Sequence, residues 1–236
     1  LMSEYEVCAI LPVYNDREAL ETAIPRSIEV LGEITDSFLL AVAEDGSTDG
    51  SAEFVREWEQ KDSRVRLFHA DERLGRGTAL TRVIRVVDAE IVCYYDVDLA
   101  TDMAHLPALV QAVRDGSDVA TGSRPMPESD IVRTQGREAA SRGYNFLVRM
   151  VLKSRLYDHQ CGFKAVRRVR ILPLLDSIEA PHWFWDTELL VRAQKKGYRI
   201  TEIPVHWRTS DKTTVRFSDI YGMGMAIFHL RRHLND

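Results

Sequence analysis

The sequence contains few cysteines and no long apolar run. Its 236 residues include three cysteines, Cys8, Cys93 and Cys161, which lie far apart and form no CxxC or CxxH spacing. This pattern argues against a zinc site and a disulfide framework, and it indicates a reducing compartment, the cytoplasm. No apolar run approaches the roughly 18 residues of a membrane span. Residues 1–6 carry neither a basic nor an apolar signal region, so we expect no signal peptide.

Several common catalytic motifs are absent as well. The chain has no GxGxxG or GxxxxGK[ST] loop, no GxSxG elbow and no HExxH pair. These absences argue against dehydrogenases, P-loop enzymes and serine hydrolases. Gly75-Arg76-Gly77 resembles part of a phosphate loop, but a tight turn at the start of a helix explains it equally well.

Charge is distributed unevenly along the chain. The net charge is −5, which argues against general nucleic-acid binding. Residues 1–130 carry 12 basic and 26 acidic side chains, a net charge of −14, whereas residues 131–170 carry ten basic and two acidic, a net charge of +8. The basic segment predicts an anionic partner such as a phosphate, a membrane surface or an RNA. The alternative is a solvated helix face that pairs with the acidic part of the chain.

Apolar runs alternate with amphipathic segments in the first half. We expect strands at 5–11, 37–43, 65–69, 91–95 and 118–121, and helices at 16–31, 52–60, 75–87 and 106–114. This alternation predicts an α/β fold whose sheet is mostly parallel and flanked by helices. Ligands of such sheets bind at the carboxyl ends of the strands. Polar clusters fall at that edge, at 12–16, 44–51, 96–98 and 121–124.

The second half is less regular. We expect helices at 137–153, 188–196 and 220–234, and a strand at 199–207 that Pro204 interrupts. The helix at 137–153 combines a wide apolar part with a basic polar part, and segment 220–232 is rich in Met and aromatic residues. Both are typical of interfacial membrane helices or of core packing. We find no repeat or linker, so we expect one domain over residues 1–236.

Two carboxylates follow the strand predicted at 91–95. Asp96 and Asp98, separated by Val97, can both reach one hard cation if they leave a strand end. Mg²⁺ and Mn²⁺ prefer carboxylate, water and phosphate oxygens, so such an ion can bridge a diphosphate and neutralise it as it leaves. The alternative interpretation is a solvated turn.

Acidic residues also lie at two other informative places. Glu44 and Asp45 follow a predicted strand and can accept hydrogen bonds from a base or ribose, or they can belong to a turn that caps the next helix. Asp186 lies in the string Trp183-Phe184-Trp185-Asp186. Burial beside aromatic rings would raise its pKa towards that of a general base. The alternative is a core-anchoring aromatic cluster.

Seven motifs in order carry a family resemblance. They are LPVYND (11–16), AEDGSTDGS (43–51), LGRGTAL (74–80), YYDVDLAT (94–101), GSR (122–124), DHQCGFK (158–164) and WFWDTELL (183–190). Together they resemble the family-2 inverting glycosyltransferases, and among these the dolichyl- and polyprenyl-phosphate glucosyl- and mannosyltransferases. The DVDLAT and QCGFK strings favour the glucosyl side.

The resemblance implies a GT-A-type nucleotide-diphospho-sugar transferase fold with a nucleotide-sugar-binding half at about 1–125 and an acceptor-facing half at about 126–236. It implies that Mg²⁺ or Mn²⁺ binds Asp96 and Asp98. The nucleotide-sugar residues it implies are Pro12, Tyr14, Asp16, Asp45, Arg76, Asp96, Val97, Asp98 and Lys212, with Arg216 as an alternative to Lys212. The acceptor-phosphate residues are Arg124 and Arg133 or Arg137. The catalytic residues are Asp98, Asp186 and Glu188.

The expected reaction is a single displacement with inversion. A hexose moves from a nucleotide sugar, UDP-glucose rather than GDP-mannose, to a polyprenyl or dolichyl phosphate. A phosphate monoester is already largely ionised near neutrality, so it needs positioning by arginines more than it needs a base. A hydroxyl acceptor would need a base, and Asp186 is then the candidate. We expect a peripheral enzyme on the cytoplasmic face of a membrane, with no nucleic-acid partner. The alternatives are transfer to a glycan hydroxyl and a non-catalytic nucleotide-sugar-binding module.

Overall fold

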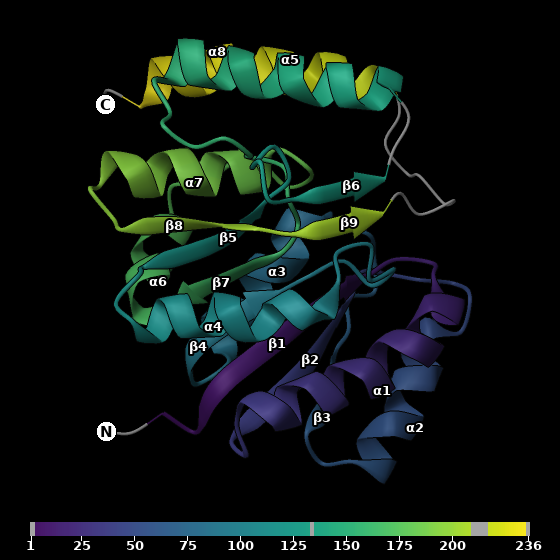
Figure 1. Cartoon of the computed structure of the whole chain (residues 1–236). Coiled ribbons are helices and arrows are strands. Elements are labelled where there is room, and N and C mark those ends of the chain that lie inside the picture. Colours follow the sequence, from purple (N-terminus) through teal and green to yellow (C-terminus); the bar gives the residue numbers. More distant parts are fainter. Residues whose placement is uncertain (1–2, 133–134, 209–216, 235–236) are drawn as a thin grey trace.

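Seven strands form one sheet that runs through the whole molecule (Figure 1). The computed structural model describes residues 3–132, 135–208 and 217–234. The strands of this sheet, in the order β3-β2-β1-β4-β7-β5-β8, are β1 (Tyr5–Val13), β2 (Phe38–Glu44), β3 (Val65–Phe68), β4 (Ala89–Tyr94), β5 (Val119–Ser123), β7 (Lys164–Arg167) and β8 (Ile200–Pro204). A second, two-stranded sheet pairs β6 (Asp130–Val132) with β9 (His206–Arg208).

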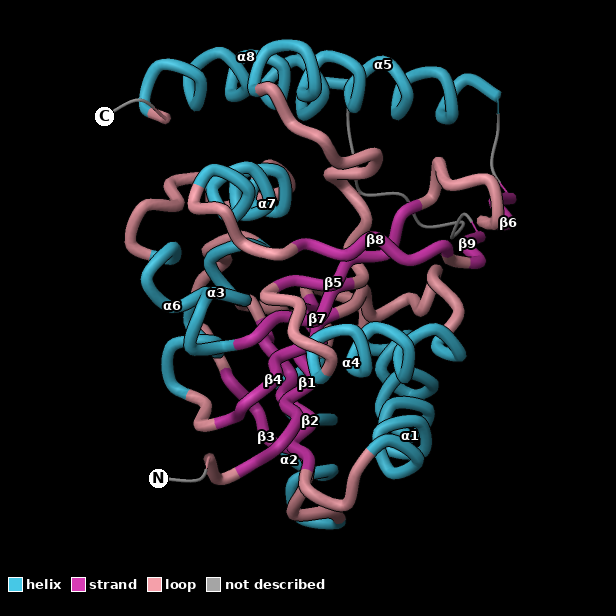
Figure 2. Tube along the Cα trace, turned by 60° about the vertical axis from the view of Figure 1, so that its left-hand side comes forward, coloured by secondary structure: helices cyan, strands magenta, loops and turns pink. Residues whose placement is uncertain are grey.

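Helices cover both faces of the large sheet. Those that share a buried core on one face are α1 (Arg17–Ile34), α2 (Ser51–Lys61) and α4 (Leu106–Arg114), the last preceded by the short 3-10 helix η1 (Met103–His105). Those that share the core on the other face are α3 (Arg76–Val86), α6 (Arg168–Leu175) and α7 (Trp185–Lys195). The helices α5 (Gln135–Leu152) and α8 (Phe217–His233) lie side by side as an outer layer over α7 (Figures 1 and 2).

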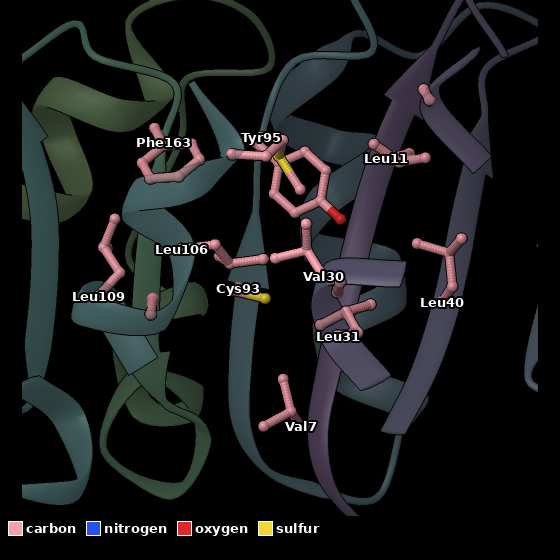
Figure 3. Packing of buried hydrophobic residues seen from close by; sticks show 14 of the residues in the cluster. Val7, Leu11, Val30, Leu31, Leu40, Cys93, Tyr95, Leu106, Leu109 and Phe163 are labelled. Atoms are coloured by element: carbon pink, nitrogen blue, oxygen red, sulfur yellow. The ribbon is translucent and has the colours of Figure 1, made fainter. Parts of the chain in front are cut away.

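The central strands are buried on both faces, which explains their continuous apolar sequence. In β1, Val7 and Leu11 point into the core under α1 and α4, whereas Cys8 and Ile10 point into the opposite core. This alternation is the two-residue period of a strand. Figure 3 shows the first of these cores, where β1 residues pack with Cys93, which is on β4. The sheet and its flanking helices match the fold expected from the sequence.

β1 continues past the proline at which we expected it to end. Pro12 lies inside β1 and is paired with Ala43 of β2. The pairing of β1 with β4 reaches only as far as Ile10. Because β1 has no partner on the β4 side at Pro12, the missing N–H of the proline breaks no ladder hydrogen bond there.

The second half departs further from expectation. β7 was not predicted, and it lies antiparallel to both β4 and β5, between them. The single strand expected at 199–207 is two strands: β8 pairs with β5, and β9 pairs with β6. The change of partner occurs at Val205, whose N–H donates to the Ser129 hydroxyl at 3.0 Å instead of to a ladder.

Candidate active site

Several of the predicted site residues lie where the strand order changes direction. From β1 the chain adds β2 and β3 on one side, and β4 on the other side. In open α/β sheets, ligands bind outside the carboxyl ends of the strands at such a switch point. The segments that leave the ends of β1, β2 and β4 here contain Tyr14, Asp45 and Asp96.

A tight turn after β4 presents the two carboxylates of the Asp-Val-Asp motif. The Leu99 N–H donates to the Asp96 carbonyl oxygen at 3.0 Å, and the Ala100 N–H donates to Asp98 Oδ1 at 3.0 Å. Leu99 has φ = +50°, a conformation that is uncommon for a leucine and that reverses the chain here. The side chain of Asp96 is 40% exposed, and Asp98 is exposed. Both carboxylates are therefore accessible to a ligand.

Arg76 connects this turn to α7. Its guanidinium donates to Asp96 Oδ1 from Nε at 3.2 Å and from Nη2 at 2.9 Å, and to Asp186 Oδ2 from Nη1 at 2.7 Å. Burial disfavours the charged guanidinium, but Asp96 and Asp186 more than offset this, so the pKa of Arg76 is raised. Gly162 packs against the cluster: a Cβ at that position would lie 2.5 Å from Asp96 Oδ2 and 2.8 Å from Arg76 Nη2.

Asp186 is buried among positive charges. Its Oδ1 accepts hydrogen bonds from the Tyr94 hydroxyl at 2.8 Å and from Lys164 Nζ at 2.9 Å. Burial alone would raise the pKa of Asp186, but Lys164 and Arg76 lower it below its ordinary value. The expectation that aromatic surroundings raise this pKa is wrong, because the two cations outweigh the burial. Trp185 does pack against the ring of Tyr94, with 5.8 Å between ring centroids.

Glu188 does not share this cluster. Residues two apart on a helix point to nearly opposite sides. The Glu188 carboxylate accepts hydrogen bonds from the N–H groups of Glu179 and Ala180 and from Arg192 Nε. It lines a cavity of about 210 Å³ between α7 and α8. Asp186 and Glu188 therefore do not form one acidic pair.

Asp45 ties the end of β2 to the Gly75-Arg76 turn. Its two oxygens accept the N–H groups of Leu74 at 2.8 Å and of Gly75 at 2.9 Å. Gly75 has φ = +105°, and a Cβ there would collide with His182 and the Pro181 carbonyl, so only glycine fits this turn. Gly75-Arg76-Gly77 is thus the tight turn into α3, and it delivers Arg76 to Asp96.

The segment after β1 lies beside this turn and is held by the loop that follows β2. The Asn15 side-chain oxygen accepts the Thr48 N–H at 2.7 Å, and the Asn15 N–H donates to the Ser47 hydroxyl at 2.9 Å. The ring of Tyr14 is exposed and lies under the guanidinium of Arg73, 4.1 Å from its centroid. These contacts place an aromatic ring and a cation at the edge of the sheet where β1 and β2 end.

A model of glycosyl transferase family 2 matches residues 8–172, more than half of the chain. The chain belongs to glycosyl transferase family 2. This confirms the family and the class of enzyme predicted from the seven motifs. Glycosyltransferase AglD of Haloferax volcanii is 46% identical over 226 residues, which cover 94% of this chain and 36% of AglD. The chain thus spans little more than a third of that relative.

A dolichyl-phosphate beta-glucosyltransferase of Dictyostelium discoideum is 26% identical over 237 residues, covering 94% of this chain and 72% of that protein. Among solved structures, glucosyl-3-phosphoglycerate synthase from Mycobacterium tuberculosis in complex with uridine diphosphate has a TM-score of 0.69 at 18% identity, covering 98% of this chain and 80% of that one. This likeness confirms the GT-A-type fold of the glycosyltransferase.

The carboxylate ligands that this site of the glycosyltransferase offers fit a hard divalent cation. Asp96 and Asp98 offer carboxylate oxygens at the strand end, the ligand type that Mg²⁺ and Mn²⁺ prefer. Among the described residues, no three His, Cys, Asp or Glu side chains come together as a complete metal site. Two carboxylates suit an ion whose remaining positions are filled by water and by phosphate oxygens of a ligand.

Arg124 has a buried partner that the sequence analysis did not foresee. It donates to Asp158 from its backbone N at 3.1 Å, from Nε at 2.6 Å and from Nη2 at 2.9 Å. Burial would raise the pKa of Asp158, but Arg124 and hydrogen bonds to the carboxylate hold it well below its ordinary value. Arg133 and Lys212, like Arg216, lie outside the described residues, and so does the side chain of Arg137 in α5.

Sequence reasoning also missed Lys164 and Tyr94. The QCGFK and YYDVD strings contain both residues, yet they were used only to identify the family. The sequence carries no clear sign that Lys164 is buried, because the four-residue strand around it lacks a long apolar run. Its partner, Asp186, comes from α7, and only the folded chain shows the pairing.

Proposed function

We propose that this glycosyltransferase transfers a hexose, with inversion, from UDP-glucose to a polyprenyl or dolichyl phosphate. The observation that carries the proposal is the pair of accessible carboxylates, Asp96 and Asp98, beside the Arg76 guanidinium at the switch point of the sheet. Adjacent negative and positive groups suit a metal-bound diphosphate leaving group.

The donor would bind over the ends of β1, β2 and β4. Tyr14 and Asp45 would face the nucleoside, together with Pro12, Asp16 and Val97, and Lys212 would contact the diphosphate. Asp96 and Asp98 would hold Mg²⁺ or Mn²⁺, which when bound neutralises the charge that develops on the departing diphosphate. The solved synthase with the same fold was also crystallised with Mn²⁺ and UDP, which supports a divalent ion and a uridine nucleotide.

The state of Asp186 favours a phosphate acceptor over a hydroxyl acceptor. A general base near neutral pH needs a pKa close to that pH. The pKa of Asp186 is lowered instead, and its oxygens are engaged by Lys164, Tyr94 and Arg76. A phosphate monoester requires no base, because its second pKa is about 6. The Dictyostelium relative, named a dolichyl-phosphate beta-glucosyltransferase, supports the same acceptor class.

The acceptor phosphate would lie at the arginines predicted to bind it. We propose that Arg124, with Arg133 or Arg137, positions it and screens its repulsion from the donor diphosphate. Arg124 already holds Asp158, so a phosphate would have to bind the N–H groups of its guanidinium that do not donate to Asp158.

The outer helices support peripheral membrane binding. Phe146 and Met150 of α5 are 64% and 65% exposed, and Met225 and Phe228 of α8 are exposed as well. Basic residues accompany them: Arg142, Arg149, Lys153, Arg155 and Arg232 are exposed. Exposed apolar side chains with flanking cations suit an anionic lipid surface, in keeping with the proposed location on the cytoplasmic face. We find no helix in the described ranges that is both long and apolar enough to cross a bilayer.

The test is sugar transfer in detergent. Labelled UDP-glucose, with labelled GDP-mannose in parallel, is incubated with dolichyl phosphate and Mn²⁺ or Mg²⁺. We expect label from UDP-glucose in the organic phase, lost with EDTA and in Asp98→Ala. The label should be retained in the control Glu90→Ala, whose exposed carboxylate lies at the start of β4, at the end of the strand opposite to Asp96. Transfer from GDP-mannose alone would replace the proposed donor.

Other outcomes overturn more of the proposal. Donor hydrolysis without lipid product would exclude a lipid-phosphate acceptor and favour a glycan hydroxyl. Neither product nor hydrolysis with any donor would favour a nucleotide-sugar-binding module.

A further inference from the structure

The two partners of Arg76 hold it unequally. On the Asp186 side the carboxylate is 4% exposed and is fixed by Tyr94 and Lys164 as well as by Arg76. On the Asp96 side the carboxylate is 40% exposed and lies on the accessible turn. A ligand that arrives from solvent can therefore separate Arg76 from Asp96, while Asp186 keeps the guanidinium in place.

The charges of the cluster are balanced as the structure stands. The two carboxylates, Asp96 and Asp186, are paired with the two cations, Arg76 and Lys164. A dication bound at Asp96 would add two positive charges beside a guanidinium that now lies 2.9 Å from the same carboxylate oxygen. Repulsion between these cations weakens the binding of the metal alone to Asp96 and Asp98.

The cluster has little room for Arg76 to move aside. The missing side chain of Gly162 provides the space that Asp96 and Arg76 occupy, as its Cβ contacts would be 2.5 and 2.8 Å. The repulsion between a bound metal ion and Arg76 can therefore be offset only by new negative charge near Arg76. A nucleoside diphosphate supplies that charge at the same edge of the sheet.

We propose that Arg76 is an internal counter-cation of Asp96 that makes divalent-metal binding depend on the diphosphate. With the diphosphate present, Arg76 exchanges Asp96 for a phosphate oxygen, and Asp96 becomes available to the metal. The inference rests on the proposed function, and it adds cooperativity between the two ligands. Because such coupling is reciprocal, the metal also strengthens diphosphate binding, typically by 5- to about 150-fold.

The test is the affinity for Mn²⁺ alone, followed by the loss of the free-ion signal in electron paramagnetic resonance. Arg76→Gln removes the charge and keeps hydrogen-bond donors. We expect it to bind Mn²⁺ without nucleotide about tenfold more tightly than the wild type, since Asp96 is partly solvent-screened. Arg76→Lys keeps the charge and should remain close to the wild type. Arg85→Gln, on the same helix in an exposed pair with Asp176, is the control and should leave Mn²⁺ binding unchanged.

The measurement is repeated with UDP, after correction for the Mn²⁺–UDP complex in solution. The ratio to be measured is the Mn²⁺ affinity with UDP divided by the affinity without UDP. It should be at least about ten in the wild type, and Arg76→Gln should lose most of it. An unchanged Mn²⁺ affinity in folded Arg76→Gln overturns the inference while UDP-dependent Mn²⁺ binding keeps the proposed function. A wild-type ratio near one overturns the inference even if Arg76→Gln does not fold. Absence of Mn²⁺ binding under all conditions overturns both.

Discussion

The ammonium of Lys164 lies 2.9 Å from Oδ1 of Asp186, and both side chains are buried. The second contact of the ammonium is with the Cys161 carbonyl oxygen. An ion pair of this kind adds little over a well-packed apolar pair, but removal of one partner leaves an uncompensated buried charge. The pair therefore holds α7 and β7 in one arrangement, beneath the site.

We predict that Asp186→Asn lowers the free energy of unfolding by about 3–5 kcal/mol, because Lys164 loses its counter-charge. Urea denaturation measures it. The control Arg26→Gln, which breaks an exposed pair with Glu29, should cost less than about 1 kcal/mol. Lys164→Met with Asp186→Asn should cost less than the sum of the two single variants. Strict additivity would show that the pair is not coupled.

We predict that stability falls between pH 6.5 and pH 5 because of His159. This ring is buried between Asn145 Oδ1 at 2.8 Å and the Ser154 hydroxyl at 2.7 Å, and burial lowers its pKa from 6.5 to about 4. Between these pKa values the unfolded chain binds the extra proton, so the stability falls as the pH falls. The expected loss is about 1.4 kcal/mol per pH unit.

Urea denaturation at pH 7 and pH 5 checks this pH dependence. His159→Gln should show a smaller difference between the two pH values, and the exposed control His233→Gln should behave as the wild type. Equal pH slopes in wild type and His159→Gln would assign the effect to other groups.

We predict that Gly162→Ala weakens Mn²⁺ binding in the presence of UDP by tenfold or more, the order expected when a metal ligand loses its supported position. The added methyl would lie 2.5 Å from Asp96 Oδ2 and must displace it. Calorimetric titration gives the affinity. Gly32→Ala is the control, because nothing lies within 4 Å of its Cβ, and in α1 it should stabilise the fold slightly. Undiminished Mn²⁺ affinity in Gly162→Ala would show that Asp96 tolerates the shift.

We predict that the paired change Phe146→Ser and Phe228→Ser reduces binding to vesicles that contain anionic lipid, because it removes exposed aromatic area from α5 and α8. Co-sedimentation with vesicles measures it, and neutral vesicles should bind less protein than anionic ones. The control Val169→Ser removes an apolar side chain, 68% exposed, from α6. Equal loss in both variants would point to non-specific adhesion.

The sequence predicted the parts of the site that depend on local order. Asp96 and Asp98 were recognised because an apolar run of strand length ends directly before them, and Asp45 for the same reason. The role of Asp186 was misjudged because its cations come from distant segments: Arg76 lies 110 residues away in the sequence. Neighbouring aromatic residues indicate burial, but only the folded chain shows which charges share that burial.

β7 was missed for a related physical reason. It has four residues, and one of them is a buried lysine, so it lacks the apolar run that marks the parallel strands. Its place in the sheet depends on β4 and β5, which both come earlier in the chain. Helix α6 follows it directly and was hidden by Pro173, which lies inside the helix.

The position of β7 has a consequence for the order of events during synthesis. A ribosome completes β4 and β5 before it makes the strand that joins them. Until residue 167 has left the exit tunnel, β4 and β5 keep open edges on the sides where β7 will pair, and open edges readily pair with other chains. The nascent glycosyltransferase can assemble β1 to β4 early, but its sheet closes only after the second half of the chain is translated.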